Sequence, residues 1–299
     1  MTARVDADVL RPVVAHTRSE VADALAQTRA RGGRVVLVPT MGALHEGHAS
    51  LMRAAARHCG PDDAVVVSIF VNPLQFGPDE DLSRYPRTFE ADLDVCAREG
   101  VTAVFAPSLG EVYPGGEPQV TIEPGPISQI LEGRSRPTHF RGVLTVVAKI
   151  FGLVAPDLAV FGEKDYQQLV LIKQMVVDLC MDVEVIGAEI VREPSGLALS
   201  SRNNYLDDDQ KTLALTISRV LRAGTEAAGL GGDQVLAAAR AVLEADSASG
   251  IDVDYLELTG PDLGPAPLAG EARLLIAARV GSTRLIDNTA LSLGEQGSN

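Results

Sequence analysis

Two histidines, His45 and His48, lie three residues apart in a glycine-containing segment. The segment follows an apolar run at residues 34–38, which predicts a buried parallel strand, and leads into a helix expected at residues 47–58. The N-terminus of such a helix offers unpaired N–H groups and a positive dipole end, which suit a phosphate. Imidazoles there can donate hydrogen bonds to phosphoryl oxygens in a transition state, and the dipole favours their neutral form. The expected phosphate-binding segment contains Met41, Gly42, Ala43, Leu44, His45, Glu46, Gly47 and His48.

Three alternative functions of this segment must be weighed against phosphate binding. Gly42 and Gly47 have the glycine spacing of a P-loop, but His48 stands where that motif has Lys, and Ala49 where it has Ser or Thr. Zinc binding is disfavoured because the histidine spacing differs from His-Glu-x-x-His and a third ligand is not evident. The histidines could also be surface residues of a turn. The position between a strand and a helix start favours phosphate binding over all three.

Other polar residues follow predicted strands or lie in a long loop. Lys164 could place a mobile cation on phosphates, and Ser200, Ser201 and Arg202 could form a cradle for an oxyanion. Alternatively, Lys164 could be a solvated residue of an ordinary turn, and residues 200–202 could be part of a polar linker.

Three more side chains are candidates for substrate or metal binding. Gln75 and Gln168 are neutral amides that can donate to a carboxylate or hydroxyl, although solvated positions are the simpler interpretation. Asp92 lies on an expected helix, where a solvated carboxylate is the default, and it could instead reach Mg²⁺.

The elements that must position these residues alternate along the first two thirds of the chain. Expected strands at 34–38, 64–71, 101–105, 158–161 and 183–186 are separated by expected helices at 47–58, 88–99, 142–154 and 165–181. Such alternation predicts a Rossmann-like, doubly wound parallel α/β sheet, in which ligands bind beyond the carboxyl ends of the strands.

The pattern changes near residue 191. Two alanine-rich helices are expected at 208–228 and 233–245, followed by strands at 253–258, 272–279 and 282–286, the last two joined as a hairpin at Gly281. We therefore expect one α/β domain at residues 1–191 and a smaller α+β domain at residues 192–299.

Composition excludes several classes of protein. The net charge of −14 and the lack of a Lys/Arg cluster argue against nucleic-acid binding. The longest apolar stretch, at residues 64–71, is too short to span a bilayer. Cys59, Cys96 and Cys180 are scattered, which is typical of reduced thiols, so we expect a cytoplasmic protein.

Several segments together resemble the pantothenate synthetase (pantoate–β-alanine ligase) family. They are residues 39–48, 68–76, 85–88, 137–143, 161–168 and 200–203. The resemblance implies a dimeric enzyme of the His-x-Gly-His nucleotidyltransferase type, with its active site between a Rossmann-like domain and a C-terminal lid. It also implies ATP as co-substrate, Mg²⁺, and two steps: pantoate attacks the α-phosphorus of ATP, and β-alanine then attacks the pantoyl adenylate.

The same resemblance assigns roles to individual residues. It implies that His48 is the catalytic proton donor, that His45 and Lys164 bind the phosphates, that Gln75 and Gln168 bind the substrates, and that Asp92 is linked to Mg²⁺. The implied ATP contacts beyond residues 41–48 are Gly162, Glu163, Lys164, Asp165, Val191, Leu199, Ser200, Ser201 and Arg202. The chain departs from the family at Leu199, where we expect Met, and at Ala91, where some members carry a second acid.

Rival functions are less well supported by the residues. A nucleotidyltransferase acting on a phosphate ester would need more cations than Gln75 and Gln168 supply. A class I aminoacyl-tRNA synthetase is disfavoured by the acidic charge and the short chain. A catalytically idle nucleotide-binding protein would be expected to have lost polar groups from one of the phosphate loops, whereas all of them retain theirs.

Overall fold

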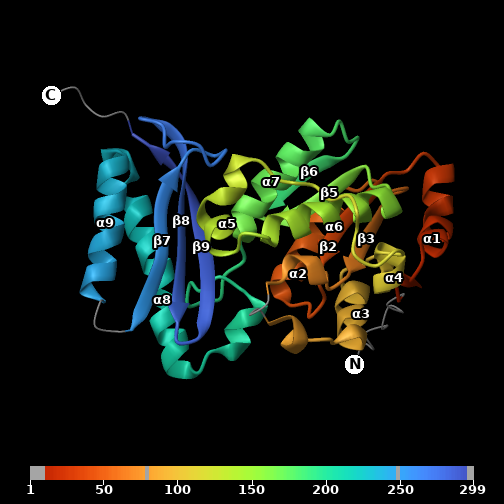
Figure 1. Ribbon diagram of the computed structural model, residues 1–299, viewed down its shortest axis with the longest axis horizontal. Coiled ribbons are helices and arrows are strands. Elements are labelled where there is room, and N and C mark those ends of the chain that lie inside the picture. The colour runs from red at the N-terminus through yellow and green to blue at the C-terminus, as the bar shows by residue number, and fades with distance from the viewer. Residues whose placement is uncertain (1–10, 78–80, 247–249, 295–299) are drawn as a thin grey trace, which may run out of the picture. The chain divides into compact units, whose positions relative to one another are not determined.

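The computed structural model describes residues 11–77, 81–246 and 250–294, and the chain divides into two compact units. Unit 1 contains Met1–Gly162 and Leu171–Ala188, and unit 2 contains Glu163–Val170 and Glu189–Asn299. Each unit has a sheet of its own (Figure 1). The domain boundary at residue 191 stays a prediction.

Unit 1 is built on a parallel sheet. In its described part the sheet has six strands in the order β1-β4-β3-β2-β5-β6. These are β1 (Val13–Ala15), β2 (Val35–Thr40), β3 (Ala64–Ile69), β4 (Ala103–Phe105), β5 (Leu158–Gly162) and β6 (Glu184–Ala188). The order runs outward from β2 to β3 and β4 on one side and to β5 and β6 on the other. This topology confirms the predicted Rossmann-like doubly wound sheet, and its switch point lies between β2 and β5.

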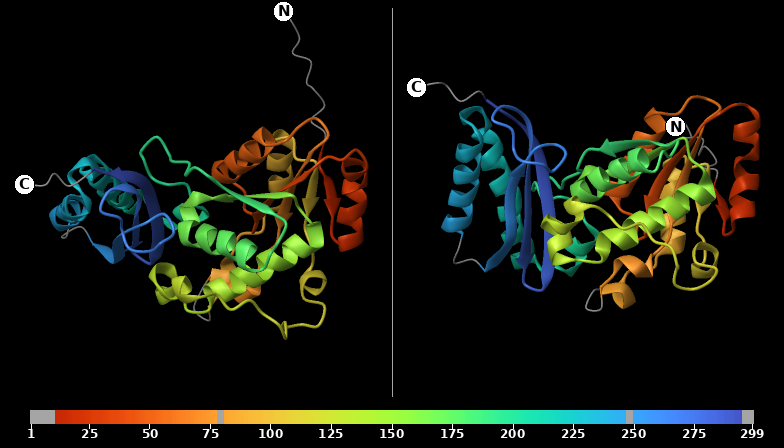
Figure 2. Two further views of the ribbon diagram at one scale, coloured as in Figure 1. Left: turned by 90° about the horizontal axis from the view of Figure 1, so that it is seen from above. Right: turned by 45° about the horizontal axis from the view of Figure 1, so that its top comes forward.

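Helices lie on both faces of this sheet (Figure 2). The described helices between its strands and after β5 are α1 (Arg18–Ala30), α2 (Glu46–Arg57), α3 (Phe89–Arg98), α4 (Leu109–Val112), α5 (Leu131–Ser135), α6 (His139–Val154) and α7 (Tyr166–Asp178), the last of which is shared between the units. Short 3₁₀ turns are η1 (Pro73–Gln75), η2 (Asp81–Arg84), η3 (Pro126–Gln129) and η4 (Glu163–Asp165).

Buried valines explain why β2 is a central strand. Val36 and Val38 pack against Met52 of α2 in one core, while Val35 and Leu37 point to the opposite face and are also fully buried. Burial on both faces is what a continuous apolar run predicts for a parallel strand.

Helix α1 begins at a capping box, in which two side chains each accept a backbone N–H. The Thr17 side chain accepts the N–H of Glu20 at 3.2 Å, and the Glu20 carboxylate accepts the N–H of Thr17 at 3.3 Å, which together form a capping box. Strand β1 was not predicted, because three residues are too few to give a periodic pattern.

Unit 2 has an antiparallel sheet in the order β7-β8-β9, with β7 at Ile251–Thr259, β8 at Gly270–Val280 and β9 at Thr283–Leu293. Val280 pairs with Thr283 across Gly281, which confirms the predicted hairpin. Its helices are α8 (Asp208–Glu226) and α9 (Gly232–Ala245), with 3₁₀ turns η5 (Ser201–Tyr205) and η6 (Ala228–Leu230).

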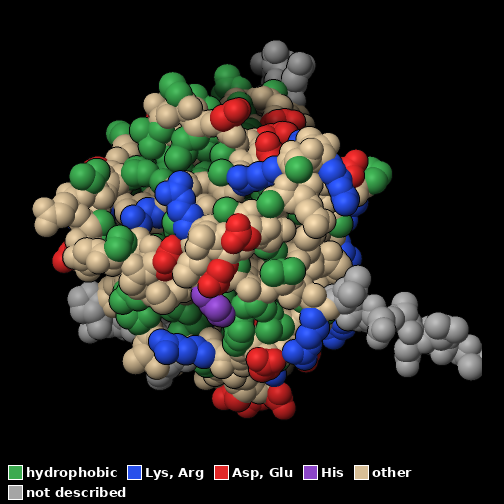
Figure 3. All heavy atoms as spheres, turned by 90° about the vertical axis from the view of Figure 1, so that its right-hand side faces the viewer, with side chains coloured by type: hydrophobic (Ala, Val, Ile, Leu, Met, Phe, Trp, Pro, Cys, Tyr) green, Lys and Arg blue, Asp and Glu red, His purple; other side chains and the backbone are tan. Residues whose placement is uncertain are grey.

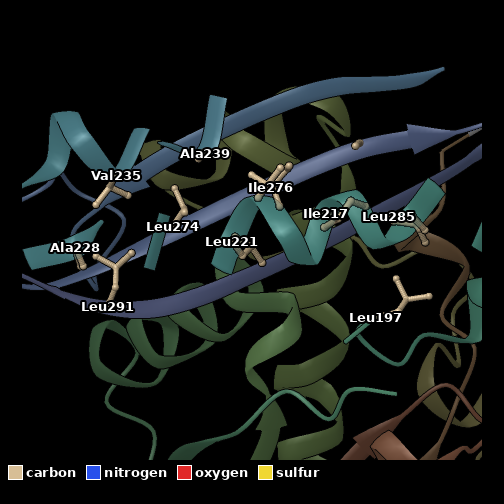
Figure 4. Packing of buried hydrophobic residues seen from close by; sticks show 14 of the residues in the cluster. Leu197, Ile217, Leu221, Ala228, Val235, Ala239, Leu274, Ile276, Leu285 and Leu291 are labelled. Carbon is tan, nitrogen blue, oxygen red and sulfur yellow. The ribbon is translucent and has the colours of Figure 1, made fainter. Parts of the chain in front are cut away.

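The core of unit 2 lies between the helices and one face of its sheet (Figure 4). Ile217 and Leu221 of α8, with Val235 of α9, pack toward Leu274 and Ile276 of β8. The two alanine-rich helices are thus amphipathic, and their apolar sides cover the sheet.

Within the described residues, every helix is too short or too polar to cross a bilayer. Cys59, Cys96 and Cys180 are free thiols. On the face drawn in Figure 3, Lys and Arg side chains are interspersed with acidic and apolar ones.

Candidate active site

The histidine loop, residues 41–48, connects the end of β2 to the start of α2. His45 is the N-cap of α2, and its Nδ1 accepts the N–H of Gly47 at 3.1 Å. Nδ1 of His48 accepts the N–H of His45 at 3.3 Å. The two imidazoles therefore replace the usual capping side chains and are held against the first turn of the helix.

These contacts determine which ring nitrogen carries the proton in each histidine. A neutral imidazole whose Nδ1 accepts a hydrogen bond carries its proton on Nε2. Both histidines are half-buried, and their ring centroids lie 4.2 Å apart. Two Nε2–H donors are thus held at a helix N-terminus, which is the arrangement expected for stabilising phosphoryl oxygens.

The Asp92 carboxylate on α3 binds the backbone of this loop. It is 2% exposed; its Oδ2 accepts the N–H of Ala43 at 3.0 Å and its Oδ1 accepts the N–H of Leu44 at 2.8 Å. Thr88 donates its hydroxyl to Oδ1 at 3.0 Å. Ala43 has a φ of 52°, which is unfavourable for a residue with a Cβ, so these bonds hold a strained turn in place.

Gly42 is required beside this carboxylate. It has a φ of 83°, and a Cβ added to it would lie 3.0 Å from Oδ2 of Asp92. A larger residue would therefore disturb both the turn and the bond that fixes it.

Gln75 lies next to the same loop within unit 1. Its Nε2 donates to the Met41 sulfur at 3.0 Å, and its Oε1 accepts from Asn72 at 3.3 Å. Asn72 is 1% exposed and also accepts the Tyr113 hydroxyl at 2.8 Å. The Gln75 carbonyl accepts from Nδ1 of His139 at 3.0 Å. The amide is therefore fixed at both ends beside the histidine loop.

A cavity of about 470 Å³ also borders the loop within unit 1. Met41, Gly42 and Asp92 form part of its wall, together with the end of β3 and residues 86–89. Its volume falls in the range of roughly 300–1,000 Å³ that is usual for small-molecule pockets.

Unit 2 contains the remaining candidate residues, apart from Gly162, which ends β5. The lysine loop, residues 162–165, is anchored through its backbone: the Lys164 carbonyl accepts from Nδ2 of Asn288 at 3.0 Å. Lys164 is half-buried, as is Gln168 on α7. Glu163 pairs with Arg273 at 2.9 Å.

The serine loop, residues 191–202, folds back on itself. The N–H of Leu199 donates to the Val191 carbonyl at 2.9 Å, which brings these two candidate ATP contacts together. Ser200 caps η5 and accepts the N–H of Arg202 at 3.3 Å. Asn203 is 6% exposed and donates to the Ala198 carbonyl at 3.0 Å.

Within each unit, candidates distant in the sequence are close in space. In unit 1 the histidine loop, Gln75 and Asp92 share hydrogen bonds. Glu46 instead pairs with Arg53 on the exposed side of α2. Sequence reasoning missed Asn72, Tyr113 and His139 as supporting residues, although Asn72 and His139 lie in segments used for the resemblance.

Comparison with known proteins decides the family. The model of the family described as pantoate-beta-alanine ligase matches residues 13–290. The chain belongs to the pantoate–β-alanine ligase family. This confirms the resemblance based on residues 39–48, 161–168 and the other segments.

Individual members of this family are similar over nearly the whole chain. A pantothenate synthetase from Nocardioides sp. strain JS614 is 62% identical over 293 residues, covering 96% of this chain and 87% of the relative. One from Mycolicibacterium smegmatis is 58% identical, covering 92% and 87%.

Solved structures of family members share the fold. Pantothenate synthetase from Thermus thermophilus superposes with a TM-score of 0.84 at 44% identity, covering 93% of this chain and 98% of that one. The pantoate–β-alanine ligase from Francisella tularensis, complexed with Beta-gamma ATP and Beta-alanine, gives 0.76 at 35% identity, with coverages of 93% and 97%.

Proposed function

We propose that this chain condenses pantoate with β-alanine, using ATP and releasing AMP and pyrophosphate. The observation that carries the proposal is the pair His45 and His48, each with Nδ1 accepting a backbone N–H at the start of α2. A carboxylate is a poor electrophile, and transfer of AMP to it supplies a good leaving group.

In the first step, a carboxylate oxygen of pantoate attacks the α-phosphorus of ATP. The new P–O bond gives pantoyl adenylate, and the bond to pyrophosphate breaks. His48 donates from Nε2 to a phosphoryl oxygen as negative charge develops, and His45 donates to the phosphates beside it. Such donors are typically worth about 10²–10⁴ in rate.

Cationic side chains assist this step. Lys164 supplies a mobile ammonium to the phosphates, and Arg202 a guanidinium that can bind two oxygens at once. The other ATP contacts are the backbone and hydroxyl groups of Gly162, Glu163, Asp165, Val191, Leu199, Ser200 and Ser201.

In the second step, the β-alanine amine attacks the acyl carbon of the adenylate. The new C–N bond forms the amide, AMP leaves with the electron pair of the C–O bond, and the amine loses a proton. Gln75 orients pantoate and β-alanine without adding charge, and Gln168 contributes a second amide to pantoate.

We propose that Asp92 supports the histidine loop and does not bind Mg²⁺ directly. Its oxygens accept from Ala43, Leu44 and Thr88, and the side chain is 2% exposed. We propose that Mg²⁺ enters bound to ATP phosphate oxygens, because this ion usually retains phosphate and water ligands.

We further propose a homodimer located in the cytoplasm, which follows from the family resemblance. Pantoate-dependent ATP–pyrophosphate exchange tests the chemistry, since exchange requires that adenylate formation be reversible in the absence of β-alanine.

A further inference from the structure

Strand β9 in unit 2 carries two consecutive buried polar residues. Asp287 is 4% exposed and Asn288 is 2% exposed. Consecutive residues of a strand point to opposite faces of a sheet, and buried polar groups require hydrogen-bond partners. The partners of these two residues therefore show what each face of β9 holds.

Asp287 holds the start of the serine loop. Its Oδ2 and Oδ1 bind Nη1 and Nη2 of Arg192 at 2.5 and 2.9 Å, a bidentate pair. The same guanidinium donates to the Gly196 carbonyl at 3.1 Å. Arg192 forms an antiparallel bridge with Ala198, so the ion pair fixes both sides of the turn between Val191 and Leu199.

Asn288 holds the lysine loop. Its Nδ2 donates to the carbonyls of Glu163 and Lys164 at 2.9 and 3.0 Å. Its Oδ1 accepts from Nε of Arg273 at 2.7 Å. Arg273 also binds the Glu163 carboxylate at 2.9 Å and stacks 3.9 Å from the centroid of the Tyr166 ring. The backbone from which the Lys164 side chain extends is thus tied to β9 at two consecutive carbonyls.

We infer that Asp287 and Asn288 are positioning residues for ATP, each setting one nucleotide loop from an opposite face of β9. The inference rests on the proposed function, because it assigns both loops to ATP. Lys164 is a flexible side chain, so its reach to a phosphate depends on where its backbone is held. A displacement of about 1 Å at a positioning group can cost roughly 10²-fold in rate.

The test compares Asp287→Asn and Asn288→Ala with a matched control, Asp254→Asn. Asp254 pairs with Arg284 of β9 at 2.7 Å, and these two residues belong to β7 and β9 rather than to the loops. Each of the three variants weakens one polar interaction of the same sheet. Steady-state ATP–pyrophosphate exchange gives KM for ATP and for pantoate, and hydrogen exchange measured on peptides reports the mobility of each loop.

We expect the two β9 variants to raise KM for ATP about tenfold or more, and more than KM for pantoate, while the control leaves both unchanged. Asp287→Asn should increase hydrogen exchange in residues 191–199 and not in residues 163–166. Asn288→Ala should show the reverse. If Asp287→Asn does not fold, Arg192→Lys retains the charge but not the bidentate geometry, and should give the same loop-specific increase.

Two results would overturn the inference. One is an unchanged KM for ATP in both β9 variants. The other is equal hydrogen exchange in both loops for all three variants, which would mean that the residues only support the sheet. Failure of the proposed function is distinguishable, because then the wild-type chain would show no pantoate-dependent exchange, whereas hydrogen exchange is measurable regardless of activity.

Discussion

The N–H of His45 donates to Nδ1 of His48 across 3.3 Å, at the first turn of α2. This bond restrains the His48 ring and places the proton of the neutral imidazole on Nε2. The proposed proton donor is therefore also the N3 residue of the capping box that begins α2. A change at His48 should affect chemistry more than folding, because the Nδ1 of His45 still accepts from Gly47.

Replacement of His48 by Ala should lower the rate of adenylate formation by about 10²-fold or more, because a donor to the phosphoryl oxygens is lost. His58→Ala, at the other end of the same helix, is the matched control and should retain the wild-type rate. Pyrophosphate exchange gives the rate, and circular dichroism verifies the fold. A near-wild-type rate for His48→Ala would assign this histidine to the turn alone.

Replacement of Asp92 by Asn should lower kcat by roughly 10–100-fold, because the turn at Ala43 loses a carboxylate acceptor and the histidines shift. The Mg²⁺ concentration that gives half-maximal activity should remain that of the wild type. Asp94→Asn serves as the control, because Asp94 lies on the same helix as Asp92 and forms an exposed ion pair with Arg11. An increased magnesium requirement in Asp92→Asn alone would instead make Asp92 a metal ligand.

Replacement of Gln75 by Glu should raise KM for pantoate about tenfold or more, because a carboxylate would repel the substrate carboxylate and cannot donate to it. KM for ATP should change less. Gln27→Glu adds the same charge at an exposed position of α1 and should leave both constants unchanged. Initial rates at varied pantoate measure the effect, and an unchanged KM for pantoate would remove Gln75 from the substrate site.

The proposed homodimer can be tested separately from the active site, through the mass of the protein in solution. Sedimentation equilibrium at micromolar concentration should yield twice the 31.5 kDa subunit mass. A single-subunit mass under those conditions would contradict the proposed dimer.

Local patterns in the sequence predicted most elements of unit 1 and the histidine loop. The valines of β2 and the glycines before α2 act within a few residues of one another, so a linear pattern contains them. The two backbone partners of Asp92 do not follow from its neighbours, because Leu44 and Ala43 lie 48 and 49 residues away in the histidine loop. On a helix, such a carboxylate has the pattern of a solvated residue.

The same reasoning explains why β9 was predicted too short. Its expected end at residue 286 falls immediately before Asp287 and Asn288, since two polar residues interrupt an apolar strand pattern. Arg192, which pairs with Asp287, is 95 residues away in the sequence, and Glu163, which binds Asn288, is 125 residues away. Only the tertiary fold supplies the groups that make these side chains stable when buried.

ATP–pyrophosphate exchange measured with and without pantoate, in the absence of β-alanine, tests the adenylation step directly. We expect exchange that requires pantoate, does not require β-alanine, and is slowed about 10²-fold or more in His48→Ala. Exchange that proceeds equally well without pantoate would contradict a pantoyl-adenylate mechanism for this chain.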